Sequence, residues 1–455
     1  MTTLTLARIL LPTDVFPPKC GGAGWSAHAL ALALIEQGHR VMALVPQRGK
    51  AGLTHADTLG VPTYRRGYTA PNIPFILNYF RHERLWPVLA NDLLMLARER
   101  TTTSAGVRSQ ESGVRITGAS ASNRVELNQK PLIIHAQHVQ VAPAAVLAAK
   151  RLRVPVVITV RDHWPWDYFA TGLHANMLPY PRQTWASLAT DLPARLGPLR
   201  GAAALIAIPY MRAHLQRRQA FLRQADAVIV GSTYMARRLA EVIDPARIQV
   251  IPNMVDLEVI EQTIAQPSTI QHLEQPFVLF VGKLERNKGA HLIPEIIRAM
   301  NVSAGFPVVI AGDGPLKPEI QSELQALGVQ ARFLEWIDHD EVLRLMARCT
   351  LLLYPSAWGE PLTRVLLEAC ACGAPMVAMP TGGTADIITN GVNGMLAPGA
   401  AALGRRAAEL LANPDLRQQL SAGAKRVARE RFAVQAVIGR VEALYSNLLT
   451  PGVSR

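Results

Sequence analysis

Short apolar runs alternate with longer segments along most of this chain. In the second half, the apolar runs fall at residues 277–281, 308–311, 332–334, 351–354 and 376–379. Each run has the length of a buried strand, and the segments between the runs carry apolar residues at helical spacing. Strands that alternate with helices favour a parallel sheet with helices on both faces. The pattern therefore predicts an α/β domain for this half.

The first half repeats the alternation less regularly, and residues 25–37 predict a helix that Gly38 ends. The pattern is lost between residues 50 and 130, where residues 101–128 are rich in Ser, Thr, Gly and Ala. Such a composition is typical of an exposed, mobile insertion. Strands are predicted at residues 6–11, 40–45, 132–136, 156–160, 227–230 and 248–252.

A chain of 455 residues exceeds one ordinary core, so we expect two domains of the same architecture. We place an N-terminal domain at residues 1–255 and a C-terminal domain at residues 256–430, with a polar linker through about residue 275. Residues 431–455 are predicted to form a C-terminal helix and tail that cross back to the N-terminal domain. Two Rossmann-like domains that face each other leave a central cleft between their strand ends.

One stretch of the second half combines these elements with candidate chemistry. The run at residues 351–354 is followed by a loop, and a helix is predicted from Pro361 to Gly373, because proline suits a first turn and glycine suits the position past the end. Glu360 precedes this helix and Glu368 lies two turns into it. Ionised carboxylates accept several hydrogen bonds, so the pair is suited to sugar or ribose hydroxyls. The loop follows a buried strand, where open α/β sheets bind ligands.

A second loop carries positive charge. After the run at residues 277–281, Gly282 and Gly289 bracket Lys283, Arg286 and Lys288. Cations just before a helix N-terminus would hold a diphosphate without a metal ion. The alternative is a solvated charged loop. The sequence contains no GxxxxGK[ST] pattern, which argues against a P-loop ATPase.

Two further features suggest the opposite wall of a cleft. Three glycines, at residues 21, 22 and 24, stand between a predicted strand and a helix, where they form a site for a ligand or only a tight turn. Polar residues follow two neighbouring strands: His135, Gln137 and His138 after the first, and residues 161–163 after the second. Because the carboxyl ends of parallel strands meet at one edge of a sheet, we expect these side chains to share a crevice.

Composition and charge narrow the class of partner. The chain is 49% apolar and 18% charged, as globular proteins are, and its formal net charge of +13 favours anionic partners. Residues 199–223 hold five arginines and no acid, with Met211, Leu215 and Leu222 on one helical face. Such a helix either lies on an anionic membrane or packs on its own domain with a solvated basic side. Both alternatives stay open at this point.

The cysteines and the chain start point to a cytoplasmic enzyme. The four cysteines form no metal-ligand array and no disulfide framework, and Cys370 and Cys372 are expected in the core. The first ten residues carry no basic segment, so we expect no signal peptide. No uncharged stretch has the character of a lipid-facing helix. Contact with the membrane is therefore expected to be peripheral if it occurs at all.

The chain resembles the retaining glycosyltransferases of family 4, which have the two-domain GT-B fold. The resemblance covers nearly the whole chain, and its most specific part is the pair of glutamates separated by seven residues in GEPLTRVLLEACACGAP. Supporting motifs are PPKCGGAGWSAHALALALIEQGH, IIHAQH, TVRDHWP, VIPNMVD, VGKLERNKG, AGDGPL and TGGTADIITNGVNG. The resemblance implies transfer of a sugar from a nucleoside diphosphate to an acceptor hydroxyl with retained anomeric configuration. It implies no metal, no other cofactor and no nucleic-acid partner.

The resemblance also implies roles for single residues. Gly22 would contact the donor diphosphate through its backbone, Lys283 and Lys288 would hold the same group, and the amides of Leu362 and Thr363 would lie near it.

The remaining roles concern the two ends of the donor and the acceptor side. Glu360 would face the donor sugar, Glu368 would hold the ribose, and Trp336 and Ile337 would bracket the base. His138 is our hypothesis for the catalytic-site histidine. The implied acceptor is a glycan or a lipid-linked group in surface glycan or glycolipid synthesis.

Four positions depart from the family pattern. Lys283 stands where arginine is usual, which loses the planar fork of a guanidinium. The second histidine of the usual HxH pattern falls on Gln137, so either this residue or His138 fills that position. Met254 replaces a common glycine, and Asp386 replaces a common glutamate. Two alternatives to a transferase are a GT-B nucleotide-sugar epimerase and a non-catalytic protein that binds a nucleotide or glycan.

Overall fold

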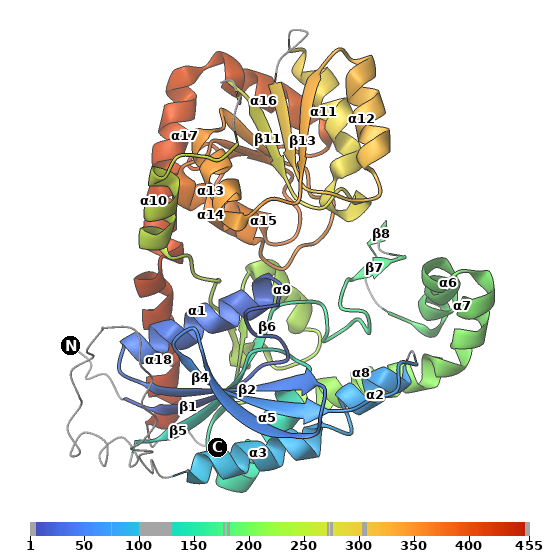
Figure 1. Cartoon of the computed structure of the whole chain (residues 1–455), viewed down its shortest axis with the longest axis vertical. Helices are drawn as coiled ribbons and strands as arrows, with labels where there is room; N and C mark the ends of the chain where they lie inside the picture. Colours follow the sequence, from blue (N-terminus) through green and yellow to red (C-terminus); the bar gives the residue numbers. More distant parts are fainter. Residues whose placement is uncertain are drawn as a thin grey trace.

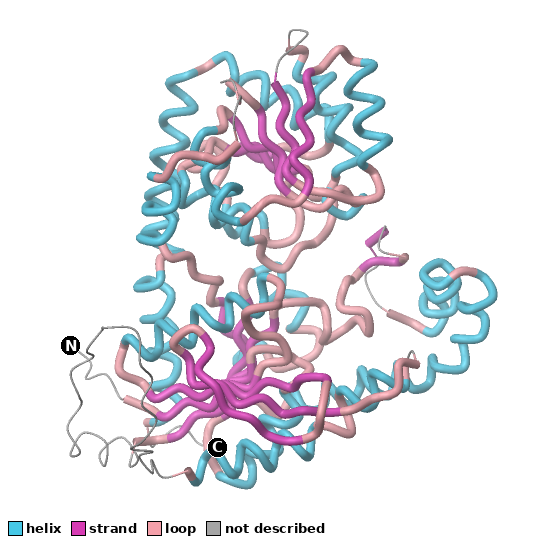
Figure 2. Tube along the Cα trace, in the orientation of Figure 1, coloured by secondary structure: helices cyan, strands magenta, loops and turns pink. Residues whose placement is uncertain are grey.

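A computed structural model gives the arrangement of the chain (Figure 1). It describes residues 6–73, 75–99, 130–175, 178–179, 183–270, 273, 276–302 and 307–450. The insertion predicted at residues 101–128 lies outside these residues. Figure 2 shows two separate sheets, each with helices around it. They are built from the first and the second half of the chain.

The first sheet holds eight strands of the described residues, in the order β10-β9-β6-β5-β1-β2-β4-β3. All neighbours are parallel except β3, which runs antiparallel to β4 at the edge. Its strands are β1 (Arg8–Pro12), β2 (Arg40–Arg48), β3 (Gly52–Thr58), β4 (Val61–Tyr68), β5 (Leu132–Ala136), β6 (Val156–Val160), β9 (Ala227–Val230) and β10 (Ile248–Val250).

The second sheet holds six parallel strands of the described residues, in the order β13-β12-β11-β14-β15-β16. A small antiparallel pair, β7 (Leu173–His174) and β8 (Leu178–Pro179), stands apart from both sheets. The strands of the second sheet are β11 (Val278–Val281), β12 (Pro307–Ala311), β13 (Gln330–Glu335), β14 (Leu351–Tyr354), β15 (Met376–Ala378) and β16 (Met395–Leu396).

Helices cover both faces of each sheet (Figure 1). The N-terminal part has α1 (Gly22–Glu36), α2 (Ile76–Arg81), α3 (Trp86–Arg98), α5 (Ala142–Leu152), α6 (Trp185–Leu196), α7 (Pro198–Ala204), η1 (Leu205–Ala207), α8 (Ile208–Leu222), α9 (Thr233–Leu239) and η2 (Pro245–Arg247). The C-terminal part has α10 (Leu257–Ala265), η3 (Arg286–Lys288), η4 (Ala290–Leu292), α11 (Ile293–Met300), α12 (Lys317–Ala326), α13 (His339–Arg348), α14 (Arg364–Cys372), α15 (Thr384–Ile387), α16 (Ala400–Ala412), α17 (Pro414–Val427), η5 (Ala428–Phe432) and α18 (Val434–Leu449).

The core of each sheet is double-sided because successive strand residues point to opposite faces. In β1, Leu10 joins a cluster with Leu93 of α3, whereas Ile9 joins a cluster with Leu34 of α1. All three central strands of the first sheet, β1, β5 and β6, are almost entirely buried. This explains why they read as continuous apolar runs rather than as alternating patterns.

Helix α18 packs against the first sheet although it follows the second in sequence. Tyr445 is 1% exposed and lies in the same cluster as Ile9, and its hydroxyl is 2.6 Å from His135 Nδ1. Glu442 pairs with His39 at 3.1 Å. The chain thus crosses between the two halves twice, and the two crossings meet in the bridge between Val255 and Ala433. The boundaries at residues 255 and 430 stay predictions.

Most predicted strands are confirmed, and those at residues 132–136, 156–160, 227–230 and 351–354 have the predicted bounds. Two predictions are wrong. The irregular region holds β3 and β4, which the pattern missed because β3 is an exposed edge strand in which only Thr58 is buried. The predicted linker holds α10, whose N-terminus is capped by the side chain of Asp256.

Helix α8, which lies in the arginine-rich segment at residues 199–223, packs on its own domain. Met211 and Leu222 of α8 are fully buried and Leu215 is 9% exposed, so the face we considered for a membrane lies in the protein interior. No helix in the described ranges is long and apolar enough to cross a bilayer.

Candidate functional site

Two loops of the second sheet follow neighbouring strands, β11 and β14, at the point where the strand order reverses. The chain leaves β11 toward β12 on one side and returns to β14 on the other, so the loops after β11 and β14 diverge at a switch point. Such points open a crevice at the carboxyl ends of the strands. These are the two loops that carry Lys288 and Glu360. The first sheet has its own switch point between β1 and β5, flanked by the loops that lead to Gly22 and His138.

Glu360 is held by two donors at the switch point. One carboxylate oxygen accepts a hydrogen bond from Lys288 Nζ and the other accepts one from the hydroxyl of Tyr354, the last residue of β14. Burial and the neighbouring carboxylate raise the pKa of Tyr354 well above its ordinary value, so the phenol stays protonated and donates. The Lys288 ammonium also lies 5.1 Å from the ring centroid of Trp358. The structure therefore brings two predicted residues, Lys288 and Glu360, into direct contact.

Backbone contacts hold the two loops together. Gly289 has φ +71°, and a Cβ atom added to it would lie 1.8 Å from the carbonyl oxygen of Pro355. The amide of Ala357 donates to the carbonyl of Asn287 at 3.1 Å. Glycine is therefore required where the two loops approach each other. Lys283, at the start of the first loop, is exposed.

Glu368 is buried and already has charged partners. It is 4% exposed, and its Oε1 accepts hydrogen bonds from Arg364 Nη2 at 2.9 Å and from His339 Nε2 at 3.1 Å. Burial alone would raise the pKa of Glu368, but the hydrogen bond from His339 and the charge of Arg364 bring it below its ordinary value. The same hydrogen bond raises the pKa of His339. The carboxylate is therefore kept ionised without a ligand.

The predicted base-binding residues lie just before the helix that contacts this carboxylate. Trp336 is 81% exposed, and Ile337 is partly buried against the core of the second domain. They directly precede α13, whose first residue, His339, contacts Glu368. The exposed indole of Trp336 provides a stacking surface, and Glu368 is a carboxylate that can accept hydrogen bonds from hydroxyl groups.

The helix after Glu360 starts three residues later than predicted. Pro361 and Leu362 belong to the loop, Thr363 is the cap residue and α14 begins at Arg364. The carbonyl of Glu360 accepts from the amide of Gly383 at 2.8 Å, and that of Pro361 accepts from Ser232 Oγ at 2.5 Å. Because these carbonyls have tertiary partners, they do not accept the helical bonds that the sequence pattern predicts.

Gly22 faces the second domain. It is the first residue of α1, and a Cβ atom added to it would lie 3.0 Å from Cδ of Arg364. The same guanidinium reaches Ser26 at 3.4 Å while it holds Glu368. Arg364 thus connects the glycine turn of the N-terminal domain with the predicted ribose carboxylate of the C-terminal domain. Arg161 is a second cation near Arg364. Burial and the charge of Arg364 lower the pKa of Arg161 to about 10.

His138 and Gln137 have different surroundings. His138 is 3% exposed, and its Nδ1 lies 2.6 Å from Oδ1 of Asp14, in the loop after β1. Gln137 is fully buried, and its side-chain oxygen accepts a hydrogen bond from Arg161 at 2.7 Å. Burial would raise the pKa of Asp14, but the charge and hydrogen bond of His138 bring it below its ordinary value. Which of His138 and Gln137 acts at the catalytic-site position stays a prediction.

Asp162 adds a titratable carboxyl to this edge of the first sheet. Burial raises its pKa to about 6 from an ordinary value of 3.8, and the charge of Asp14 adds to the rise. The charge of His138 and the hydrogen bond from the amide of Trp164, at 3.0 Å, act in the opposite direction but are smaller. Three titratable groups from the loops after β1, β5 and β6 are therefore coupled.

This raised pKa predicts a pH-dependent stability difference for Asp162→Asn. A carboxyl whose pKa is higher in the folded than in the unfolded state binds more protons in the folded state. Its contribution to the free energy of unfolding is therefore fully present below about pH 4 and is lost as the pH rises through 6. Asparagine does not titrate, so the variant does not lose this stability as the pH rises. We expect it to gain up to about 3 kcal/mol relative to wild type between pH 4 and pH 7.

Denaturant unfolding of both proteins at pH 4, 5, 6 and 7 measures this difference. Two stability curves that run parallel over the whole range would contradict the buried, raised carboxyl.

The two domains touch beside Glu360. His163 Nε2 lies 3.0 Å from the carbonyl of Gly359, and the indole of Trp358 donates to the carbonyl of Thr171 at 2.7 Å. On the other side, the amide of Thr233 donates to Asp386 at 2.8 Å. The loop that carries Glu360 is thus in contact with the N-terminal domain.

Several residues of this site escaped the sequence reasoning. Arg364 could have been found, since it lies four residues before Glu368 on the same helix. Tyr354 and His339 carried no sequence signal beyond their places at a strand end and a helix start. Cys370 and Cys372 are buried free thiols, as predicted, and Cys349 is also buried. Among the described residues, no group of His, Cys, Asp or Glu is arranged to hold a metal ion.

Comparison with known proteins gives two family matches that divide the chain between them. The model described as Glycosyltransferase Family 4 matches residues 20–259, which is more than half of the chain. The model described as Glycosyl transferases group 1 matches residues 262–427.

The chain is similar to glycogen synthase of Mycobacterium tuberculosis, with 26% identity over 395 residues, 85% of this chain and 81% of the relative. It is 32% identical over 193 residues to D-inositol 3-phosphate glycosyltransferase of Mycolicibacterium paratuberculosis, which covers 40% of this chain and 43% of the relative.

Solved structures show the same fold. HepE of Anabaena, in complex with UDP, superposes with a TM-score of 0.62 at 18% identity over 97% of this chain and 100% of that chain. Sucrose-phosphate synthase of Thermosynechococcus elongatus gives a TM-score of 0.61 at 19% identity over 97% and 99%. The chain therefore has the GT-B fold and belongs to glycosyltransferase family 4.

Proposed function

We propose that this glycosyltransferase moves a sugar from a nucleoside-diphosphate sugar to an acceptor hydroxyl and retains the anomeric configuration. The proposal rests on one observation, the contact of Lys288 with Glu360 at the switch point of the second sheet. A cation and a carboxylate side by side suit the junction between a diphosphate and a sugar, which needs positive charge on one side and hydroxyl acceptors on the other. Glu368, held by Arg364, extends this arrangement toward a ribose.

The donor would lie along the edge of the second sheet. Its diphosphate would be held by Lys283 and Lys288, by the amides of Leu362 and Thr363 before α14, and by the backbone of Gly22 from the other domain. Lys288 would then exchange its partner, the Glu360 carboxylate, for phosphate oxygens.

The two ends of the donor would meet different groups. The freed carboxylate of Glu360 would accept hydrogen bonds from sugar hydroxyls, and Glu368 would accept them from the ribose. Trp336 and Ile337 would bracket the base. The exposed indole and the ionised state of Glu368 support these assignments.

The reaction breaks the bond between the anomeric carbon and the donor phosphate oxygen and forms one between that carbon and the acceptor oxygen. Retention follows if the acceptor enters on the face that the diphosphate leaves. The acceptor proton then passes to the departing diphosphate. Lys283 and Lys288 supply positive charge for that group, so we propose that no divalent metal is required.

The acceptor would bind against the N-terminal domain. The coupled groups His138, Asp14 and Asp162 lie in loops at the strand ends of the first sheet, and polar side chains of this kind suit hydroxyl groups. We propose a glycan or a lipid-linked acceptor. The names of the relatives, glycogen synthase and D-inositol 3-phosphate glycosyltransferase, agree with hydroxyl-rich acceptors.

A screen of nucleotide sugars tests the proposal. Since HepE has been crystallised with UDP-glucose, UDP-sugars come first, followed by ADP- and GDP-sugars. We expect one base to raise the melting temperature, because a ligand that binds only the folded state stabilises it. The matching sugar donor should release nucleoside diphosphate equally in EDTA and in magnesium.

Other outcomes of the screen contradict the proposal. Binding without release would point to a non-catalytic protein. Conversion of the donor sugar to its epimer would point to an epimerase. Release that stops in EDTA and returns with magnesium would overturn metal independence.

A further inference from the structure

A pair of short helices stands apart from both sheets and exposes large apolar side chains. Helices α6 and α7 lie at the right-hand edge of Figure 1, beyond the first sheet and away from its core. Leu199, in the first turn of α7, is 86% exposed, and Ile206, in η1 just after α7, is 88% exposed. We call these two residues and Arg200 the tip. Trp185, Leu196 and Leu205 are also among the exposed large hydrophobic residues. Exposed apolar side chains gathered in this way mark an interaction surface.

The hairpin is tightly packed. A Cβ atom added to Gly201 of α7 would lie 2.2 Å from Cα of Pro193 in α6, so the two helices are in backbone contact. Leu188 and Leu192 of α6 share a buried cluster with Met211 of α8. The exposed residues at the tip are therefore displayed by a packed element rather than by a loose loop.

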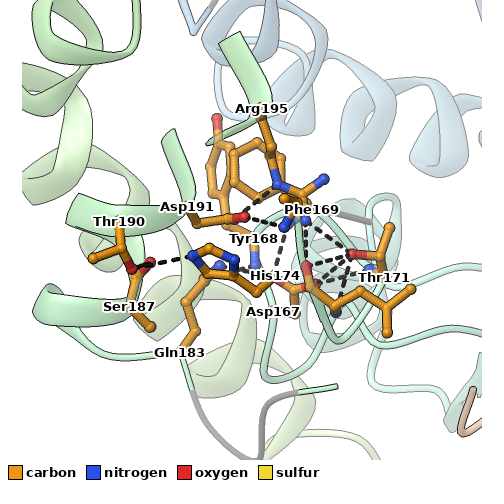
Figure 3. A network of polar contacts seen from close by, with 12 residues as sticks. Asp167, Tyr168, Phe169, Thr171, His174, Gln183, Ser187, Thr190, Asp191 and Arg195 are labelled. Atoms are coloured by element: carbon orange, nitrogen blue, oxygen red, sulfur yellow. Dashed lines mark hydrogen bonds and ion pairs between the residues drawn. The ribbon is translucent and has the colours of Figure 1, made fainter. Parts of the chain in front are cut away.

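A network of polar contacts holds the C-terminal part of α6 in place (Figure 3). Asp167 accepts hydrogen bonds from the amides of Thr171 and Gly172 at 2.8 and 2.7 Å. Arg195 pairs with Asp191 at 2.7 Å and donates to Thr171 Oγ1 at 3.2 Å. Thr171 is also the residue whose carbonyl accepts from Trp358 beside Glu360. The hairpin is therefore joined to the loop that meets the catalytic cleft.

The segment that includes the tip is rich in arginine. Residues 192–225 contain six arginines and no acidic residue. Arg200 is exposed directly after Leu199, whereas the preceding acid, Asp191, is buried and paired with Arg195. Elsewhere in this segment, Arg217 pairs with Glu83 and Arg218 is buried. The tip therefore combines apolar side chains with one exposed cation, Arg200.

We propose that the tip formed by Leu199, Arg200 and Ile206 docks on an anionic lipid membrane. Apolar side chains that enter the headgroup boundary beside cations are the usual means of interfacial binding. Pairing of two copies through this face is disfavoured, since it would bring like charges together in a protein of net charge +13. The tip is a different surface from the apolar face of α8, which is buried. Docking of the tip would hold the cleft near the membrane.

Vesicle binding by the full chain tests this inference without donor or acceptor, so the result is independent of the proposed transfer. We expect sedimentation with vesicles of phosphatidylcholine and phosphatidylglycerol, and at least about tenfold weaker binding to phosphatidylcholine alone. Leu199→Glu with Ile206→Glu should reduce binding to anionic vesicles by about tenfold or more. Arg200→Gln should weaken it less and mainly at low salt.

Val259→Glu is the matched control, because Val259 is 53% exposed on α10 of the other domain. It should bind vesicles as wild type does, and the melting temperatures of all variants should agree. Equal binding by wild type and the double variant would overturn the inference. The inference would also be overturned if the wild-type protein were a dimer that does not bind vesicles and the double variant were a monomer. The tip would then bind a second copy of the chain.

Discussion

Glu360→Gln is expected to lower the rate of sugar release from the nucleotide donor by about 10²–10³-fold. Glutamine keeps the size of the side chain but removes the negative charge that Lys288 and Tyr354 hold in place. Positive charge that develops on the sugar in the transition state then lacks its partner. The measurement is kcat and KM for release of nucleoside diphosphate, together with the melting temperature. A loss in kcat with an unchanged melting temperature assigns the effect to chemistry.

Glu335→Gln provides the control for this prediction. Glu335 lies in the same domain and pairs with Lys317, but its side chain is 66% exposed. Exposed ion pairs contribute little, so this variant should retain wild-type kinetics and stability. If Glu360→Gln also retained wild-type kinetics, the cleft at the second switch point would not be the active site.

Gly289→Ala is expected to destabilise the C-terminal domain by about 3 kcal/mol or more. The glycine has φ +71°, which is strained for alanine, and the added Cβ would collide with the carbonyl of Pro355. Relief of the collision must separate the loops of Lys288 and Glu360. The variant should therefore also bind the donor more weakly. Calorimetric unfolding and a donor titration by fluorescence measure the two effects.

The same substitution at Gly439 shows what alanine does where space is free. A Cβ atom at this position in α18 meets nothing within 4 Å. Gly439→Ala should unfold at the wild-type temperature or slightly above it, because alanine favours helices. If Gly289→Ala behaved in the same way, the close approach of the two loops would be contradicted.

The parallel sheets were predictable because their strands are buried on both faces. Such strands are continuous apolar runs, and β14 illustrates this with four buried residues of the sequence LLLY. Strand β3 was not predictable, since its outer face and most of its inner face meet solvent. Helix α10 was missed although Leu257, Ile260 and Ile264 recur at helical spacing and pack on the core, because the polar residues between them resemble those of a linker.

The site was predictable where chemistry follows a strand end. Glu360 and Lys288 were singled out separately, and the structure shows that the β11–β14 pairing brings their loops together. The late start of α14 could not be foreseen, because the partners of the Glu360 and Pro361 carbonyls come from residues distant in sequence. The pairing of His138 with Asp14 is likewise a contact between the loops after β1 and β5, which no local pattern records.

The buried face of α8 shows a further limit of pattern reading. Met211, Leu215 and Leu222 formed the apolar stripe that suggested a membrane helix, and they pack inside the domain. The residues that remain exposed, Leu199 and Ile206, lie in and just after α7, which the sequence pattern did not predict. Periodicity identifies an apolar face but not the element that covers it.

The anomeric configuration of the released sugar tests the central claim most directly. Wild-type enzyme and the preferred α-linked nucleotide sugar are mixed in EDTA, and proton NMR follows the sugar released to water in the first minutes, before mutarotation. The arrangement of Lys288, Glu360 and Glu368 predicts the α anomer as the first product, absent in Glu360→Gln. The β anomer as the first product, or equal release by the variant, would contradict the proposed retaining mechanism.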